Sequence, residues 1–186
     1  MRGVVTLRKL LLLGALSALA AVLAGCGAGD PPPLGSGGSG GRACVPAPRI
    51  GTPVSMVLFD LDNQGAAPVT VLSVSLPNAH GMAMTEAWLV QLHPHSEQLG
   101  MGGPWPPVTD SLWAARVPAV GGVILPGKVL ELAFGMLRTT AADGSSDGPV
   151  IVYRAGRTTF TLREGTSLAV ARTKCQLVGF GSSENT

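Results

Sequence analysis

The fold class of this chain is decided by residues 54–76, which read VSMVLFDLDNQGAAPVTVLSVSL. Residues 54–61 are mostly apolar and β-branched, a composition typical of a strand. Residues 62–68 then collect Asp, Asn, Gly and Pro, which favour turns. Residues 69–76 alternate, with Leu72, Val74 and Leu76 on one face and serines on the other. We therefore expect two β-strands joined by a turn.

The same kind of pattern continues along the chain. It predicts further strands at 84–92, 122–125, 129–134, 150–154, 157–162 and 167–171, a long irregular insertion at 93–107 and one short helix at 110–116. Gly156 can supply the positive φ that the predicted hairpin turn requires. Seven or eight short strands, with turn signals about every ten residues, predict an all-β fold, an Ig-like or related β-sandwich. We place this domain at 44–180 and a disordered tail at 181–186.

The strand, Asn-x-Gly turn and Pro-Val-Thr-Val strand between Leu61 and Val74 resemble those of Ig-like domains of exported bacterial proteins. The resemblance covers two strands. Ig-like domains bury alternating side chains between two packed sheets, so it implies the same β-sandwich.

The first 26 residues have the features of an export signal. Arg2, Arg8 and Lys9 precede an apolar run at 10–25, which ends in Leu23-Ala24-Gly25-Cys26. A basic start, an apolar centre and small residues before a cleavage point are the parts of a secretory signal. The alternative is a permanent membrane-spanning anchor. The run of about 16 residues is short of the roughly 20 that such a helix needs.

The motif at 23–26 resembles the lipobox of bacterial lipoprotein precursors. That resemblance implies that residues 1–25 are removed as a signal peptide and that Cys26 carries diacylglycerol on its sulfur. A diacylglyceryl group provides the two acyl chains that stable anchoring requires. We therefore expect an extracytoplasmic protein, anchored by lipid on the outer face of the cell membrane.

Removal of this segment changes the charge of the chain. The full sequence has 13 basic and 11 acidic residues, and three of the basic ones lie within residues 1–25. The remaining chain is nearly neutral and has no cluster of Lys and Arg, which argues against nucleic acid as a partner. Residues 26–43 are rich in Gly, Ser and Pro and cannot bury enough apolar surface to fold. We expect a disordered tether there.

Two cysteines remain once Cys26 is lipidated: Cys44 and Cys175, one near each end of the predicted domain. A pair of cysteines in an exported chain is best explained by a disulfide. The alternative is two free thiols that act as soft metal ligands, although neither has a CxxC spacing or a neighbouring His.

His80, Met82 and Met84 occupy alternate positions, so in an extended segment their side chains project from one face. Imidazole and thioether donors together favour Cu(I). In this respect the run is similar to the His/Met sites of periplasmic copper chaperones of the PCu(A)C type, which are also small β-sandwiches. An envelope copper chaperone or metal-binding protein is therefore our alternative function. Otherwise Met82 and Met84 fill gaps in the core.

The insertion carries Met101 and Trp105 on a Gly- and Pro-rich loop, and Trp113 follows shortly after. Tryptophan is enriched at binding hot spots, and loops often carry function. Trp105 either forms an exposed interaction loop or folds back over the edge of the sandwich. No Ser or Cys stands in a recognisable nucleophile setting. We therefore predict a non-enzymatic binding module without a cofactor, held at the membrane by its lipid, with a protein partner in the envelope.

Overall fold

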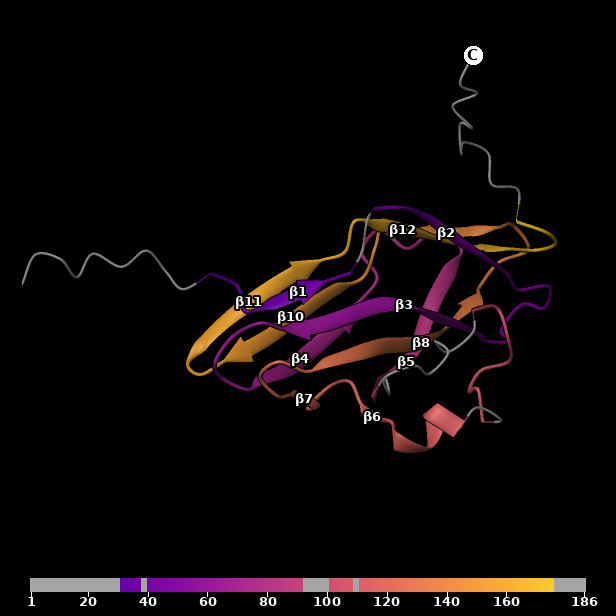
Figure 1. Ribbon diagram of the computed structural model, residues 1–186. Helices are drawn as coiled ribbons and strands as arrows, with labels where there is room; N and C mark the ends of the chain where they lie inside the picture. The colour runs from indigo at the N-terminus through magenta and orange to yellow at the C-terminus, as the bar shows by residue number, and fades with distance from the viewer. Residues whose placement is uncertain (1–30, 38–39, 92–100, 109–110, 176–186) are drawn as a thin grey trace, which may run out of the picture. The chain divides into compact units, whose positions relative to one another are not determined.

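The computed structural model describes residues 31–37, 40–91, 101–108 and 111–175 (Figure 1). Its regular elements there are twelve strands and one short 3-10 helix: β1 (Leu34–Ser36), β2 (Gly41–Pro46), β3 (Val54–Asn63), β4 (Val69–Ser75), β5 (Met82–Gln91), η1 (Ser111–Ala115), β6 (Val117–Pro118), β7 (Val123–Ile124), β8 (Val129–Arg138), β9 (Gly144–Ser146), β10 (Val150–Ala155), β11 (Thr158–Arg163) and β12 (Thr166–Ala171). The predicted signal peptide, Cys26 and the tail at 181–186 lie outside the described residues. Within the described ranges, no helix has the length and apolar character needed to cross a bilayer.

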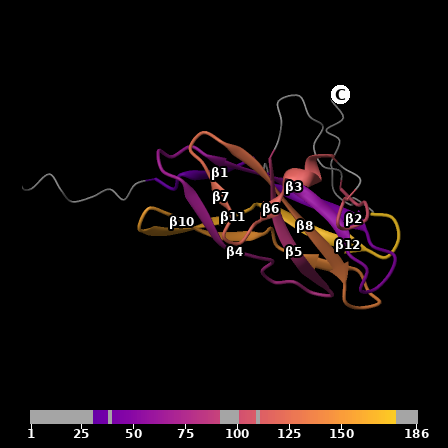
Figure 2. The ribbon, with the colours of Figure 1, turned by 90° about the horizontal axis from the view of Figure 1, so that it is seen from below.

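The described strands form three sheets (Figure 2). A five-stranded sheet has the order β1-β3-β8-β5-β6, a four-stranded sheet the order β11-β10-β4-β7, and a three-stranded sheet the order β2-β12-β9. Neighbouring strands run antiparallel except β2 and β12, which are parallel. The predicted hairpin is observed as β10 and β11, with Gly156 at a φ of +58° in its turn.

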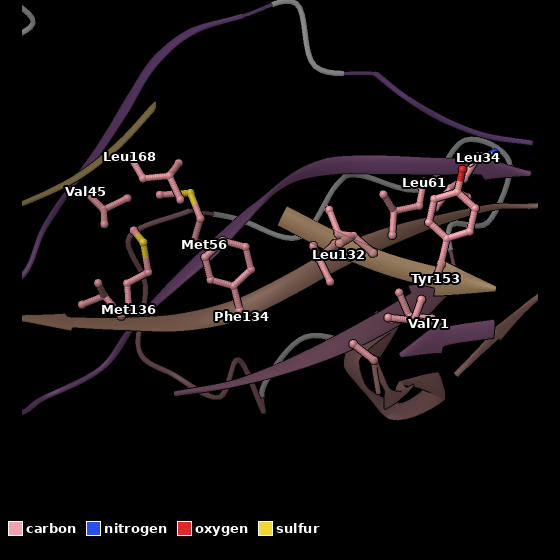
Figure 3. Packing of buried hydrophobic residues seen from close by; sticks show 14 of the residues in the cluster. Leu34, Val45, Met56, Leu61, Val71, Leu132, Phe134, Met136, Tyr153 and Leu168 are labelled. Carbon is pink, nitrogen blue, oxygen red and sulfur yellow. Dashed lines mark hydrogen bonds between the residues drawn. The ribbon is translucent and has the colours of Figure 1, made fainter. Parts of the chain in front are cut away.

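One hydrophobic core joins the three sheets (Figure 3). Its members include Met56, Leu132 and Phe134 from the five-stranded sheet, Val71 and Tyr153 from the four-stranded sheet, and Val45 and Leu168 from the three-stranded sheet. Full burial of one such side chain stabilises the fold by about 1.5–3 kcal/mol. The five-stranded sheet therefore packs one face against the two smaller sheets, and the predicted all-β sandwich is confirmed.

The first two predicted strands are observed as β3 and β4, but one side chain of β4 faces away from its expected position. The ladder between β4 and β10 skips one residue between Val71 and Ser73, so Leu72 is an extra residue in a bulge. A bulge breaks the simple alternation of a strand. Val71 is buried in the core and Val74 packs against it, whereas Leu72 is 37% exposed. The prediction that Leu72 shares a face with Val74 is wrong.

Strand β1 lies inside the segment that the sequence predicts as a tether. Its three residues pair with β3, and Leu34 is 2% exposed in the core. The Leu34 amide donates to the Tyr153 hydroxyl at 3.4 Å. The prediction of a tether rests on the average composition of the segment. An average does not reveal that a single leucine can be buried when its short strand pairs with the edge of a sheet. The structure therefore differs from the predicted linker at 26–43 in β1 and from Gly41 onward, where β2 begins.

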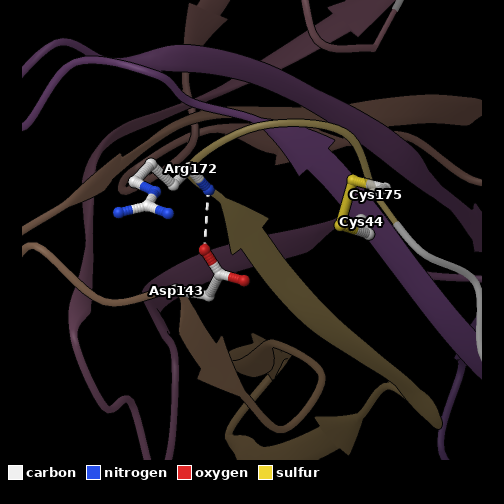
Figure 4. The surroundings of a disulfide bond; sticks show 4 residues. All are labelled: Cys44, Asp143, Arg172 and Cys175. Atoms are coloured by element: carbon white, nitrogen blue, oxygen red, sulfur yellow. Dashed lines mark hydrogen bonds between the residues drawn. A yellow bond between two sulfur atoms is a disulfide. The ribbon is translucent and has the colours of Figure 1, made fainter.

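Cys44 and Cys175 form the predicted disulfide, with their Cα atoms 5.8 Å apart (Figure 4). Cys44 lies in β2, and Cys175 follows β12, the parallel neighbour of β2. Nearby, the Arg172 amide donates to a carboxylate oxygen of Asp143 at 2.7 Å. The two cysteines are 131 residues apart in sequence, and closing such a loop is worth roughly 5 kcal/mol in the chain-entropy model.

Candidate functional site

The three predicted copper ligands lie in different surroundings. His80 is exposed, and the following Gly81 has a φ of +65° just before β5 begins. Met82 is 5% exposed inside the core, and Met84 packs partly against it. Thus the structure places both methionines where the core-filling alternative expects them. No group of three or more His, Cys, Asp or Glu side chains gathers among the described residues, and copper binding stays a prediction.

Three tryptophans and one arginine form what we call the aromatic cluster: Trp88, Trp105, Trp113 and Arg116. The ring centroids of Trp105 and Trp113 lie 5.0 Å apart, and those of Trp88 and Trp113 lie 5.8 Å apart, both in edge-to-face geometry. Trp113 is 2% exposed. It packs with Val57, Val90 and Ala133, which lie on the face of the five-stranded sheet opposite the main core. Trp113 is a core residue, so its assignment to an exposed interaction loop is wrong.

The last part of the insertion, residues 101–107, is hydrogen-bonded to β3. The Gly102 amide donates to the Ser55 carbonyl and the Ser55 amide donates to the Gly103 carbonyl, each at 2.9 Å. Of the three predicted loop residues, Met101 alone is exposed, at 46%. Trp105 folds back over the sheet, as the second interpretation of this loop proposed. Residues 93–100 of the insertion lie outside the described residues.

Trp105 lies directly against Gly135 of β8. A Cβ added at Gly135 would come within 2.6 Å of the indole ring of Trp105 and within 2.4 Å of the Thr85 hydroxyl. Real Cβ atoms do not approach other atoms so closely. The absence of a side chain at Gly135 is therefore what allows Trp105 to pack on the sheet.

Arg116 stacks on two rings of the aromatic cluster. Its guanidinium carbon lies 4.9 Å from the ring centroid of Trp88 and 4.7 Å from that of Trp113. Its Nη1 donates to the Trp113 carbonyl at 3.0 Å. The three indole N–H groups and the Nε of Arg116 are buried, and none has a hydrogen-bond partner in the described part of the chain. A cation over an aromatic face contributes about 0.5–1 kcal/mol at exposed sites and more when desolvated.

Exposed aliphatic side chains gather in a different place, between β6 and the start of β8. The described chain has nine exposed large hydrophobic residues, and five of them lie in this stretch: Val117, Val120, Val123, Leu125 and Val129. Their exposed fractions are 38–60%. Scattered apolar residues are normal on a protein surface, whereas a contiguous group marks an interaction site.

A hollow that three of these five residues line, which we call the seam groove, has a volume of about 200 Å³. It is lined by Leu89, Gln91, Ala115, Val117, Val123, Leu125, Lys128 and Leu130. Val117 belongs to β6 and Val123 to β7, which end the five-stranded and the four-stranded sheets. Leu89 is 1% exposed and belongs to the main core. The seam groove therefore runs between two sheet edges toward the interior of the sandwich.

Sequence reasoning did not identify the seam groove. Residues 117–126 read VPAVGGVILP, with large aliphatic side chains between Gly and Pro. Connecting segments are usually rich in Gly, Pro, Asn, Asp and Ser. A connection that lacks polar side chains is therefore the sequence signal that could indicate this exposed apolar surface.

Glu164, between β11 and β12, is a buried carboxyl group with 6% exposure. Burial raises its pKa, and the Ser36 hydroxyl beside it opposes that shift. Neither carboxyl oxygen has a partner in hydrogen-bonding geometry among the described residues. Glu164 also borders a hollow of about 280 Å³ that Asp147 and Arg163 share. Its oxygens are almost fully covered, so a ligand in that hollow would not contact them, and we assign no site there.

Comparison with protein-family models gives no match, and comparison with curated proteins gives none either. Two solved structures are similar in shape. One is the ASH/PapD-like domain 7 of human CEP192, with 10% identity and a TM-score of 0.40 over 81% of this chain and 94% of that one. The other is the Vibrio cholerae VesB protease, with 9% identity and a TM-score of 0.38 over 75% of this chain and 32% of that one. Both similarities are too distant to tell what this chain binds.

Proposed function

We propose that this chain is a lipid-anchored extracytoplasmic protein without catalytic activity, which binds a protein partner through the seam groove. The anchor is supported by Leu23-Ala24-Gly25-Cys26 and by the basic and apolar residues that precede it. An extracytoplasmic location is also supported by the disulfide, because such bonds persist in oxidising compartments.

The binding role rests on one observation, the gathering of exposed aliphatic side chains along the seam groove. Removing apolar surface from water is favourable by about 25 cal/mol per Å². In the isolated protein the free energy of burying these side chains is not realised, because they stay in contact with water. A partner that covers them would bury them and gain this free energy. The aromatic cluster offers less for this purpose, because Trp113 is already buried.

The anchor is tested by a Cys26→Ser variant of the full precursor, expressed in its native envelope. We expect the wild-type protein to fractionate with membranes and the variant to be released into the soluble extracytoplasmic fraction. A variant that stays with the membranes through alkaline washing would contradict a lipid anchor at Cys26.

The binding role is tested by placing a photo-crosslinking amino acid at Leu125 in one variant and at Leu72 in another. Both leucines are exposed, but only Leu125 lines the seam groove. We expect a covalent adduct of one defined mass from position 125 in intact cells and none from position 72. Equal adducts from both positions, or none from either, would refute binding through the seam groove.

A further inference from the structure

The volume of the seam groove limits what it can hold. Sites for small molecules and cofactors usually enclose about 300–1,000 Å³, and the seam groove has about 200 Å³. A cavity of about 150 Å³ is enough for benzene. The seam groove therefore fits one or two aliphatic side chains, which a partner must present on a backbone that stays outside.

The backbone beside the seam groove is an open sheet edge. Val71 exchanges hydrogen bonds with Gly121 and Gly122, at 2.9 and 3.0 Å. Antiparallel ladders alternate between bonded and non-bonded pairs, so the neighbouring pair Thr70–Val123 is non-bonded. The peptide N–H and C=O of Val123 then point away from β4, toward the side of β7 where the described sheet ends.

The two edges beside the groove are not equivalent. Edge strand β6 contains Pro118, which has no N–H to donate, and proline is one way in which proteins block the pairing of an edge. Edge strand β7 has no proline, and its first residue Val123 and the following Leu125 are 47% and 54% exposed. Strand pairing is therefore favoured at β7.

The charge of the seam groove indicates which charged group of a bound partner would be attracted to it. Lys128 is the one charged side chain among the residues that line it, and the other polar side chain is Gln91. A carboxylate near Lys128 would be attracted, whereas a second cation would be repelled.

Resting on the proposed function, we propose that the occupant of the seam groove is an extended segment of a partner protein. This segment adds to β7 as a further strand, places alternate aliphatic side chains in the groove and brings a carboxylate to Lys128. Strand addition gives affinity through main-chain hydrogen bonds and specificity through the side-chain pockets.

The test uses three synthetic peptides, each labelled with fluorescein, and the chain from residue 26 onward with Cys26→Ser and an intact disulfide. In the first peptide valine alternates with threonine and the last residue is glutamate, with an amidated terminus. The second ends in glutamine instead. The third has the sequence of the first with alternate peptide nitrogens methylated, which removes strand hydrogen bonds. Binding is measured by fluorescence anisotropy, and hydrogen exchange is followed at residues 123–125.

We expect the glutamate peptide to bind, to slow amide exchange at residues 123–125 and to bind about twofold to fivefold more tightly than the glutamine peptide. Lys128→Gln should abolish that difference, and Leu125→Asp should abolish binding of both. The matched control Leu72→Asp, on β4 outside the groove, should bind as the parent does. Near-ultraviolet circular dichroism verifies that each variant is folded.

Equal binding of the methylated peptide, or binding without slower exchange at residues 123–125, would overturn strand addition. A failure of all three peptides to bind would overturn it too. If crosslinks from Leu125 still appear in cells, the proposed function survives that failure. A dimer of this chain that Leu125→Asp dissociates would instead identify the occupant as a second copy and refute a separate partner.

Discussion

The aromatic cluster and the seam groove are both apolar regions beside β5, yet one is covered and the other is open. Adjacent residues of β5 serve them, since Trp88 belongs to the aromatic cluster and Leu89 lines the seam groove. Each region also has one cation, Arg116 in the first and Lys128 in the second. The difference is that η1 and Trp105 close the first region, whereas the described chain leaves the second exposed.

This contrast shows that residue type is a poor guide to which apolar surface binds a partner. Tryptophan buries a large area and reaches far from the backbone, so a few tryptophans can cover the outer face of a sheet by themselves. Valine is short and cannot cover its neighbours in the same way. Here the tryptophans complete the fold, and valines and leucines form the apolar surface that stays exposed in the described chain.

The largest loss of stability is expected when a side chain of the aromatic cluster, the covered region, is removed. Trp113→Ala removes the centre of the aromatic cluster and leaves a cavity on the outer face of the sheet. We expect the free energy of unfolding to fall by about 3–5 kcal/mol. Urea unfolding followed by circular dichroism measures it. A loss under 1 kcal/mol would mean that Trp113 is not a core residue.

A smaller loss of stability is expected when a side chain is added at Gly135, on which Trp105 packs. Gly135→Ala places a methyl group against the indole and the Thr85 hydroxyl, and overpacking of this kind costs about 1–3 kcal/mol. The matched control is Gly103→Ala in the segment that carries Trp105. Its Cβ would meet the Ser55 hydroxyl at 3.6 Å, an ordinary contact. Equal stability of the two variants in urea unfolding would show that Trp105 does not lie on Gly135.

A change of intermediate size, here a gain in stability, is expected at Glu164, which belongs to neither of the two regions. Burial raises the pKa of Glu164 above its ordinary value of 4.5, so as the pH rises the unfolded chain releases this proton before the folded chain does. The folded state then binds more protons, and stability falls with rising pH until the raised pKa is passed. Below pH 4.5 the effect is absent.

The corresponding variant is Glu164→Gln, which keeps the size of the side chain and removes its charge. We expect it to be more stable than the wild type by about 1–2 kcal/mol at neutral pH, because an unpaired buried group no longer has to ionise. The gain should disappear at pH 4. Chemical unfolding of both proteins across this range measures the difference, and a gain independent of pH would show that ionisation is not its cause.

The smallest effect on stability is expected in the open region. Leu125 is 54% exposed, and substitutions at such surface positions change stability by about 0.5 kcal/mol or less. Leu125→Ser should therefore unfold at the same urea concentration as the wild type while it no longer binds the glutamate peptide. A loss of stability comparable to that of Trp113→Ala would place Leu125 in the core and remove the contrast between the two regions.

Much of the fold could be predicted from the sequence, because strand and turn signals are local. The strands β3, β4, β5, β8 and β12, the β10–β11 hairpin and the disulfide were all predicted within a few residues of their observed positions. Two local departures were not visible. The bulge at Leu72 depends on the partner strand β10, and the strand at Leu34 depends on an open edge of β3.

The candidate site was less predictable, because alternation tells which side chains share a face but not what covers that face. Glu131 alternates with Leu132 and Phe134 along β8 and so lies on the opposite face of the strand, yet it is 2% exposed, because that outer face is covered as well. The same limit applies to Trp113 and Val123. Whether each is buried or exposed depends on segments distant in sequence, and no local pattern records that.

The Cys44–Cys175 bond also determines how the molecule responds to mechanical load. When the two ends of the chain are pulled, the force passes through the disulfide, so it bypasses the chain between two cysteines that are 131 positions apart in sequence. About 430 Å of contour length is therefore withheld from stretching. Among the described elements, only β1 and the start of β2 lie in the path of the force. Under tension applied at the N-terminal end of the chain, β1 would separate from β3 first, and the sandwich with its seam groove would stay intact.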